Sequence, residues 1–133
     1  METISHLTFI VQDLEKSADL FKTIFEAKEV YSSGNHFHSL TKEKFLMIDK
    51  LWIALMEGES LPTKSYNHSA FKIKESEYGT YLKRIQQLGI EIKQGRKRIA
   101  GEAQSIYFYD YDNHLFELHT GTLEDRLKAY GVY

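Results

Sequence analysis

Two stretches of this chain, ISHLTFIVQDLEKSADLFKTIFEAKEV (residues 4–30) and YNHSAFKIKESEYGTYLKRIQQLGIEI (residues 66–92), can be laid on each other without a gap. His6 then meets His68, an offset of 62 residues. Each copy opens with a strand pattern that carries this histidine, continues as an amphipathic helix and ends as a second strand. The repeat therefore predicts two copies of one module.

The helix in each copy follows from the spacing of its apolar residues. Steps of three and four residues place one apolar stripe on each helix: Leu14, Ala18, Phe21 and Phe25 in the first copy, and Tyr78, Leu82, Ile85 and Leu88 in the second. Asp13 is the expected N-cap of the first helix, and Gly89 ends the second as a C′ residue. Thr122 followed by Asp125 resembles a capping box at the start of a last helix.

Strand-like runs rich in aromatic and β-branched residues fill the rest of each copy: residues 35–41, 43–57, 105–110 and 114–119. We therefore predict an α+β fold of two paired βαβββ modules in a single domain, residues 1–133. Module 1 covers about residues 1–60, module 2 about 65–121, and a C-terminal helix about 122–131. One such module has too small a core to be stable alone, so pairing, within a chain or across a dimer, would close the sheets around a cavity.

Composition excludes several classes of protein. Of 133 residues, 42% are apolar and 27% are charged, which excludes a disordered or low-complexity chain. A net charge of −2 gives no basic surface for nucleic acid or anionic lipid. The absence of cysteine excludes disulfides and thiolate chemistry, so any metal would be held by His, Asp or Glu. With no signal peptide and no apolar run of about 20 residues, we expect a cytoplasmic protein with no membrane partner.

Strand alternation selects the candidate metal ligands. In the first strand, His6 and Thr8 lie on the face opposite the packing residues Leu7, Phe9 and Val11. His68 is the equivalent residue of the second copy, so the two histidines can converge by pseudo-symmetry. A third ligand is expected on a late strand, where we favour Glu117 and keep His119 as the alternative. Two histidines and a carboxylate suit Mn²⁺ or another divalent ion such as Fe²⁺, Zn²⁺, Ni²⁺ or Co²⁺, with positions open for substrate.

Other polar residues are less decisive. His36 and His38 lie in a polar segment, and His114 is expected to be a solvated turn residue. Glu43, in TKEKF, is either a solvent-facing residue or a general base over the cavity, and its position alone does not decide. The basic residues 96–98 and Arg126 are either a solvated face or a binding site for a phosphonate or carboxylate.

The segments ISHLTFIV, TKEKF, LWIALMEG, YNHSAF and SIYFYDYDNHLFELHTGTLEDRL together carry a resemblance that spans the chain. In their order and spacing they resemble the vicinal-oxygen-chelate superfamily (the glyoxalase and bleomycin resistance superfamily). Within it they are similar to the fosfomycin resistance proteins of the FosX branch, which are Mn²⁺-dependent fosfomycin epoxide hydrolases.

The resemblance implies roles for individual residues. His6, His68 and Glu117 would bind the metal, and Glu43 would be the general base that activates water. The positions that match the family's substrate contacts are Thr8, Trp52, Tyr66, Lys97, Ser105, Tyr107 and Arg126. The resemblance also implies a domain-swapped homodimer, with His6 of one subunit meeting His68 and Glu117 of the other, and fosfomycin or a similar phosphonate epoxide as substrate.

Two other functions are compatible with the same scaffold. A thiol transferase would add glutathione, bacillithiol or cysteine to the epoxide, and Glu43 counts against it. A non-enzymatic binding protein would not need the full set of His6, His68 and Glu117. A metal-dependent dioxygenase or isomerase would share these ligands but would not need TKEKF.

Overall fold

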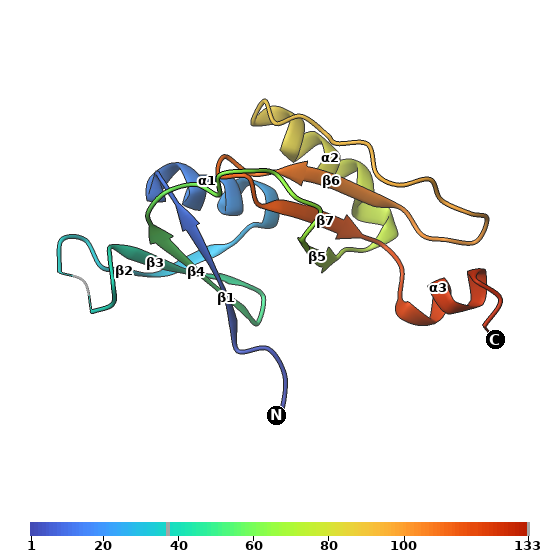
Figure 1. Ribbon diagram of the computed structural model, residues 1–133, viewed down its shortest axis with the longest axis horizontal. Helices are drawn as coiled ribbons and strands as arrows, with labels where there is room; N and C mark the ends of the chain where they lie inside the picture. Colours follow the sequence, from blue (N-terminus) through green and yellow to red (C-terminus); the bar gives the residue numbers. More distant parts are fainter. Residues whose placement is uncertain (37, 133) are drawn as a thin grey trace. The chain divides into compact units, whose positions relative to one another are not determined.

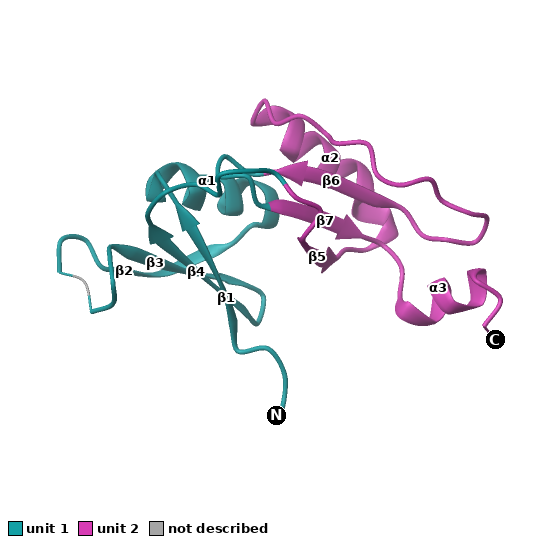
Figure 2. Ribbon diagram, viewed as in Figure 1, with its two compact units in different colours: residues 1–64, 110–114 teal, residues 65–109, 115–133 magenta. Residues whose placement is uncertain are grey.

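The computed structural model describes residues 1–36 and 38–132 (Figure 1). The chain forms two compact units, coloured separately in Figure 2. Unit 1 consists of Met1–Lys64 and Asp110–His114, and unit 2 of Ser65–Tyr109 and Leu115–Tyr133. Each unit contains one sheet, and the predicted α+β class is confirmed. The module boundaries drawn from the sequence stay a prediction.

Unit 1 is a four-stranded sheet with one helix. Its elements are β1 (His6–Val11), α1 (Leu14–Phe25), β2 (Lys28–Ser32), β3 (Glu43–Ile48) and β4 (Leu51–Glu57). The strand order is β1-β4-β3-β2, with β1 parallel to β4 and the other neighbours antiparallel. The predicted run 43–57 is thus a hairpin, and Asp49 at its turn has a φ of 50°.

Helix α1 forms where the spacing predicts it. The Asp13 side chain caps it by accepting a hydrogen bond from the Lys16 amide at 3.0 Å. Its apolar stripe is buried against the sheet, together with Leu46, Ile53 and Leu55 of β3 and β4. This packing covers one face of the unit 1 sheet and leaves the other face, with His6 and Thr8, without a helix.

A turn from late in the sequence completes unit 1. Residues 110–114 join two strands of unit 2, yet they pack with unit 1. The buried Asp112 carboxylate accepts hydrogen bonds from the Gln12 amide at 3.0 Å and the Ser60 hydroxyl at 2.5 Å. His114 is not the solvated residue that the sequence predicts, because its ring hydrogen-bonds Asp110 at 2.8 Å and packs edge-on against Phe9.

Unit 2 repeats the arrangement with fewer strands. Its elements are β5 (His68–Lys72), the 3₁₀ turn η1 (Glu75–Glu77), α2 (Tyr78–Gln87), β6 (Ser105–Tyr109), β7 (Leu115–His119) and α3 (Leu123–Ala129). The strand order is β5-β7-β6, with β5 parallel and β6 antiparallel to β7. Figure 1 shows α2 running along this sheet. Ile85 of α2 and the sheet residues Ile106, Phe108, Phe116 and Leu118 are almost fully buried.

Helix ends in unit 2 agree with the sequence. Gly89, just after α2, has a φ of +71°, the left-handed conformation expected of a C′ residue. Thr122 and Asp125 form the predicted capping box of α3. Helix α3 has no buried residue, so core packing contributes little to its stability.

Two predicted strands are wrong. The described residues of 35–41 form a turn and bends, and Phe37 lies outside the described residues. This polar stretch follows Gly34 at a φ of +55° and has no alternating apolar face to bury. The strand expected around residues 90–92 is replaced by an isolated bridge between Lys93 and Tyr107. No helix in the described part of the chain is long and apolar enough to cross a membrane.

Candidate functional site

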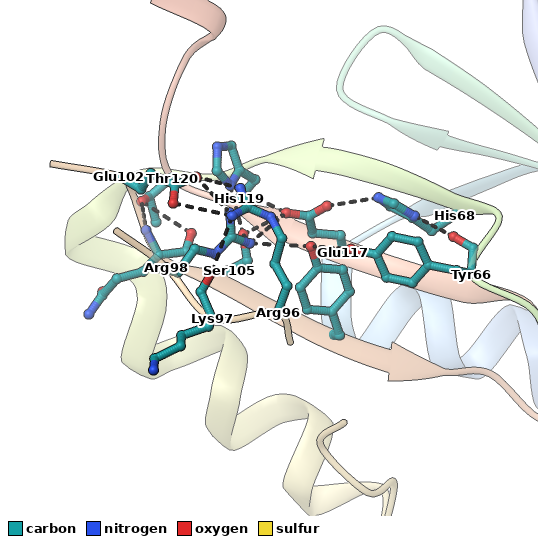
Figure 3. A network of polar contacts seen from close by, with 12 residues as sticks. Tyr66, His68, Arg96, Lys97, Arg98, Glu102, Ser105, Glu117, His119 and Thr120 are labelled. Atoms are coloured by element: carbon teal, nitrogen blue, oxygen red, sulfur yellow. Dashed lines mark hydrogen bonds and ion pairs between the residues drawn. The ribbon is translucent and has the colours of Figure 1, made fainter. Parts of the chain in front are cut away.

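The strand alternation in unit 2 places five polar side chains on the face that α2 does not cover. The register pairs Ser105 with His119 and Tyr107 with Glu117, while His68 pairs with Leu115. All of these side chains lie on one face of the sheet, because side chains alternate along a strand and the residues between them point into the core. Figure 3 shows His68, Ser105 and His119 in one polar network around Glu117.

His68 and Glu117, two of the predicted metal ligands, face each other. The Nε2 atom of His68 lies 3.0 Å from Oε1 of Glu117. The other ring nitrogen, Nδ1, is 2.6 Å from the Tyr66 carbonyl oxygen, which can only accept, so Nδ1 carries the hydrogen. In the neutral ring the lone pair of Nε2 therefore faces a carboxylate oxygen. This juxtaposition calls for a cation between them, either a proton or a metal ion.

The second oxygen of Glu117 has different neighbours. Ser105 donates its hydroxyl hydrogen to Oε2 at 2.5 Å. Nδ1 of His119 and a guanidinium nitrogen of Arg98 lie 3.3 and 3.5 Å from the same oxygen. The Glu117 side chain is only 4% exposed, so these contacts act with little solvent screening.

The surroundings set the ionisation of this network. Burial alone would raise the pKa of Glu117, but hydrogen bonds from Ser105 and Tyr107 and the nearby histidines bring it below its ordinary value. Burial lowers the pKa of His119, more than the Glu117 charge raises it. Burial, the Tyr66 hydroxyl and the Glu117 charge raise the pKa of Tyr107. Near neutral pH, Glu117 is thus an ionised carboxylate beside a protonated Tyr107 phenol.

The open face of unit 1 carries the other predicted residues. On β1 and its neighbour β4, the register puts His6 beside Trp52 and Thr8 beside Ala54. The His6 and Trp52 rings stack with centroids 4.1 Å apart, and Nδ1 of His6 lies 3.0 Å from the Ser5 hydroxyl. His6 thus has a local partner for Nδ1, as His68 has. When Nδ1 donates to the hydroxyl oxygen, the lone pair of Nε2 is left for a ligand.

Glu43 is the first residue of β3 and lies on the same open face. It alternates with Lys44, which pairs on the α1 side with Glu15 at 2.9 Å and Glu29 at 3.0 Å. Glu43 is only 7% exposed, and its backbone amide donates a hydrogen bond to the Ser33 hydroxyl at 3.0 Å. The solvent-facing alternative for Glu43 is therefore wrong, and a buried carboxylate on the ligand face suits a general base.

The predicted metal ligands lie in different units, His6 in unit 1 and His68 with Glu117 in unit 2. Among the described residues, no three His, Cys, Asp or Glu side chains gather into a metal site. The His68–Glu117 pair still fits a divalent ion. Two ligand atoms at right angles, each about 2.0–2.2 Å from a metal, lie about 3 Å apart, as Nε2 and Oε1 do.

In the basic loop, residues 94–104, Arg98 and Lys97 have different surroundings. Arg98 reaches Ser105 at 2.8 Å and the Tyr107 hydroxyl at 3.2 Å. Lys97 is exposed, and in Figure 3 its amine points away from Glu117. A pocket of about 530 Å³ opens beside this loop and is lined by Lys97, Arg98, Ser105 and Tyr107 among others. Tyr66 adjoins it through its hydroxyl, 3.3 Å from that of Tyr107.

Two residues of the loop's network were not chosen from the sequence. Arg98 was only one of three adjacent cations, and loop residues have no periodicity that singles one out. Glu102 binds the Arg96 guanidinium and accepts from the Ile99 amide at 2.8 Å, and the Tyr130 hydroxyl lies 3.3 Å from it. Arg126 of α3 is half-buried, whereas His36 and His38 are exposed.

Comparisons with known proteins place the chain in a family. Residues 3–118 match the model of the Glyoxalase/Bleomycin resistance protein/Dioxygenase superfamily. The fosfomycin resistance protein FosX of Listeria innocua is 58% identical over 127 residues, 96% of each chain. The metallothiol transferase FosB of Staphylococcus saprophyticus is 38% identical, over 98% of this chain and 84% of that protein.

A solved structure gives the same result. A glutamate-to-glutamine variant of FosX from Listeria monocytogenes, complexed with Mn(II) and 1S,2S-dihydroxypropylphosphonic acid, superimposes with a TM-score of 0.89. It is 53% identical and the match covers 98% of each chain. The chain therefore belongs to the Glyoxalase/Bleomycin resistance protein/Dioxygenase superfamily and, within it, to the FosX group.

Proposed function

We propose that this chain is a Mn²⁺-dependent hydrolase that opens the oxirane of fosfomycin by adding water and so gives resistance to the antibiotic. Support comes from the FosX relatives and from the ligand in the FosX complex. A dihydroxypropylphosphonic acid is what the addition of water to an epoxypropylphosphonate yields. The observation that carries the proposal is the His68–Glu117 pair, whose facing atoms are 3.0 Å apart on the face of the sheet that α2 does not cover. We propose the cytoplasm as its compartment.

His6, His68 and Glu117 would hold the metal. Two histidines and one carboxylate leave positions open on a divalent ion. The bound ion would act as a Lewis acid that neutralises the charge developing as the C–O bond opens. Within the chain, Tyr66 and Ser5 hold Nδ1 of the two histidines, which leaves Nε2 of each as the ligand atom.

The ligand set would be completed between chains. His6 and the His68–Glu117 pair belong to different units, and the open faces of both sheets lack a covering helix. We propose a homodimer in which His6 of one chain joins His68 and Glu117 of a second chain. Each dimer would then contain two such sites, related by its two-fold axis.

Glu43 would be the general base. Its carboxylate would take one proton from a water whose oxygen forms a bond to the phosphonate-bearing carbon. The bond between that carbon and the oxirane oxygen breaks, and the oxirane oxygen keeps the electron pair and gains a proton from solvent. Burial on the ligand face keeps Glu43 away from competing solvent contacts.

The phosphonate would be held by cations and hydroxyls. Lys97 and Arg126 would bind its charged oxygens, and Thr8 and Tyr107 would donate hydrogen bonds. Tyr107 can donate because its raised pKa keeps the phenol protonated. Trp52 and Tyr66 would line the pocket. The buried Nε1 of Trp52 has no hydrogen-bond partner among the described residues and could donate to a substrate oxygen.

A thiol transferase is the second candidate, because the FosB relatives are metallothiol transferases. Incubation of fosfomycin with the protein and Mn²⁺, followed by phosphorus NMR and mass spectrometry, separates the two. We expect a product heavier by one water, formed without thiol and lost with a chelator. A product that forms only with glutathione, bacillithiol or cysteine would favour the transferase. Unchanged fosfomycin in every arm would leave a binding protein and contradict the proposal.

A further inference from the structure

Ser105 occupies the centre of the polar network on the open face of unit 2. It is the first residue of β6 and lies opposite His119 in the register. Its hydroxyl oxygen is 2.5 Å from Oε2 of Glu117, 2.7 Å from Nδ1 of His119 and 2.8 Å from a guanidinium nitrogen of Arg98. Figure 3 shows the three groups around it.

The hydrogen-bonding capacity of this hydroxyl is filled. A serine hydroxyl has one hydrogen to donate and two lone pairs to accept with. The ionised Glu117 can only accept and Arg98 can only donate, so the hydrogen goes to Glu117 and one lone pair faces Arg98. Nδ1 of His119 must then donate to the second lone pair. Nothing is left on the hydroxyl for a phosphonate oxygen.

The two oxygens of Glu117 have different neighbours as a result of these contacts. Oε2 accepts from Ser105 and has His119 and Arg98 within 3.3 and 3.5 Å. Oε1 faces Nε2 of His68 at 3.0 Å. A carboxylate with one oxygen held in this way presents only the other oxygen to a cation, and it cannot rotate without breaking a short hydrogen bond.

We propose that Ser105 is a positioning residue that holds Glu117 as a metal ligand through a single oxygen, and not the phosphonate contact that the family resemblance implies. This inference rests on the proposed metal site. His119, the alternative ligand considered from the sequence, also helps to position Glu117, because its Nδ1 is directed to Ser105 and Glu117. Arg98 links this support to the basic loop.

The test compares Mn²⁺ affinity in three variants of the full chain without substrate. The concentration of free Mn²⁺ is measured by electron paramagnetic resonance during a titration. Ser105→Ala should weaken Mn²⁺ binding about 10–100-fold, the usual effect of losing an outer-sphere partner of a ligand. Ser105→Thr keeps the hydroxyl and should restore affinity to near the wild-type value. Ser76→Ala, at an exposed serine of η1, is the matched control and should change nothing.

Kinetics at saturating Mn²⁺ provide the second measurement. With the metal site filled, Ser105→Ala should keep the KM for fosfomycin within about twofold of wild type, since no substrate contact is lost. A Ser105→Ala variant with wild-type Mn²⁺ affinity and a raised KM would overturn the inference and restore the phosphonate role. If wild type binds Mn²⁺ but leaves fosfomycin unchanged, the proposed function fails while the affinity comparison still decides on Ser105. If wild type binds no Mn²⁺, both fail.

Discussion

Single residues determine which atoms of this site can bind a cation. The Tyr66 carbonyl takes the Nδ1 hydrogen of His68, and this fixes Nε2 as the atom that faces Glu117. Ser5 has the corresponding place beside His6. Stacking on Trp52 further restricts the His6 ring. A local partner for each histidine means that both are oriented before any ion binds, which reduces the ordering that binding would require.

The proposed general base, Glu43, can be tested by a single substitution. Glu43→Gln should leave Mn²⁺ and phosphonate binding intact and lower the rate of fosfomycin hydrolysis about 10²–10⁴-fold, since the amide cannot take the proton of water. Product formation is followed by phosphorus NMR and Mn²⁺ affinity by titration. Glu57→Gln, at an exposed glutamate of β4, is the control and should retain full activity. Hydrolysis by Glu43→Gln at near the wild-type rate would remove Glu43 from the mechanism.

Among the elements, the basic loop has one carboxylate, Glu102, that makes several contacts within it. Glu102 binds Arg96, the Ile99 amide and the Tyr130 hydroxyl, and so ties the loop both to itself and to the residue that follows α3. Its side chain is 1% exposed. The described strand pairing next to the loop is the bridge at Lys93, just before it. The contacts of Glu102, together with those of Arg98 to Ser105 and Tyr107, therefore hold the loop in place.

Removing this carboxylate should loosen the loop. Glu102→Gln keeps the size of the side chain but loses the ion pair with Arg96, so trypsin should cut at residues 96–98 roughly two- to fivefold faster. The control is Glu124→Gln on α3, whose ion pair with Lys128 is exposed on both sides. Equal cleavage of Glu102→Gln and wild type would show that the loop is held by other contacts.

The pH dependence of the same group has a defined sign. The Arg96 hydrogen bond, followed by that of the Ile99 amide, lowers the pKa of Glu102 from 4.5 to about 2. A depressed pKa means that the contribution to stability is complete above about pH 4.5 and is lost as the pH falls toward 2. The Ile99 amide resonance should therefore stay constant down to about pH 4 and then shift with a midpoint near 2. A midpoint near 4.5 would contradict this.

For the molecule as a whole, the sequence predicts most of what depends on periodicity. Apolar spacing located α1 and α2, and alternation along β1 placed His6 and Thr8 opposite the buried Phe9 and Val11. The run around residues 90–92 misled because it contains only two apolar residues, and the structure pairs just Lys93 with β6. Whether a short apolar run pairs with a neighbouring strand depends on tertiary contacts, which the local sequence pattern does not contain.

The site was predicted less completely than the fold. Strand alternation selected His68 and favoured Glu117 over His119, because these residues lie on strands with a clear inward face. It left two roles open for Glu43, and only the family resemblance chose the general base. The residues alone did not distinguish Arg98 from Lys97, and the resemblance named Lys97. A loop has no repeating geometry, so the contacts of Arg98 with Ser105 and Tyr107 could not be predicted. The sequence likewise gave no signal that the Ser105 hydroxyl would be fully occupied by protein groups.

Mixing two inactive variants tests the proposed dimer. His6→Ala and His68→Ala should each lose Mn²⁺ and activity. If the ligands come from different chains, a heterodimer of the two variants contains one intact site, so subunit exchange should restore about a quarter of wild-type activity. His36→Ala, at an exposed histidine outside the proposed site, is the control and should stay active alone. No recovery after verified exchange would place the three ligands within one chain.

The central claim is that water, without a thiol, opens the oxirane on a Mn²⁺ site. The most direct measurement is a reaction of fosfomycin with the protein and Mn²⁺ in ¹⁸O-labelled water, with thiols omitted. Mass spectrometry with fragmentation of the product should find a diol with one labelled oxygen on the phosphonate-bearing carbon, and a chelator should abolish it. A diol labelled on the other carbon would contradict the direction of attack, and the absence of any diol would contradict the hydrolase itself.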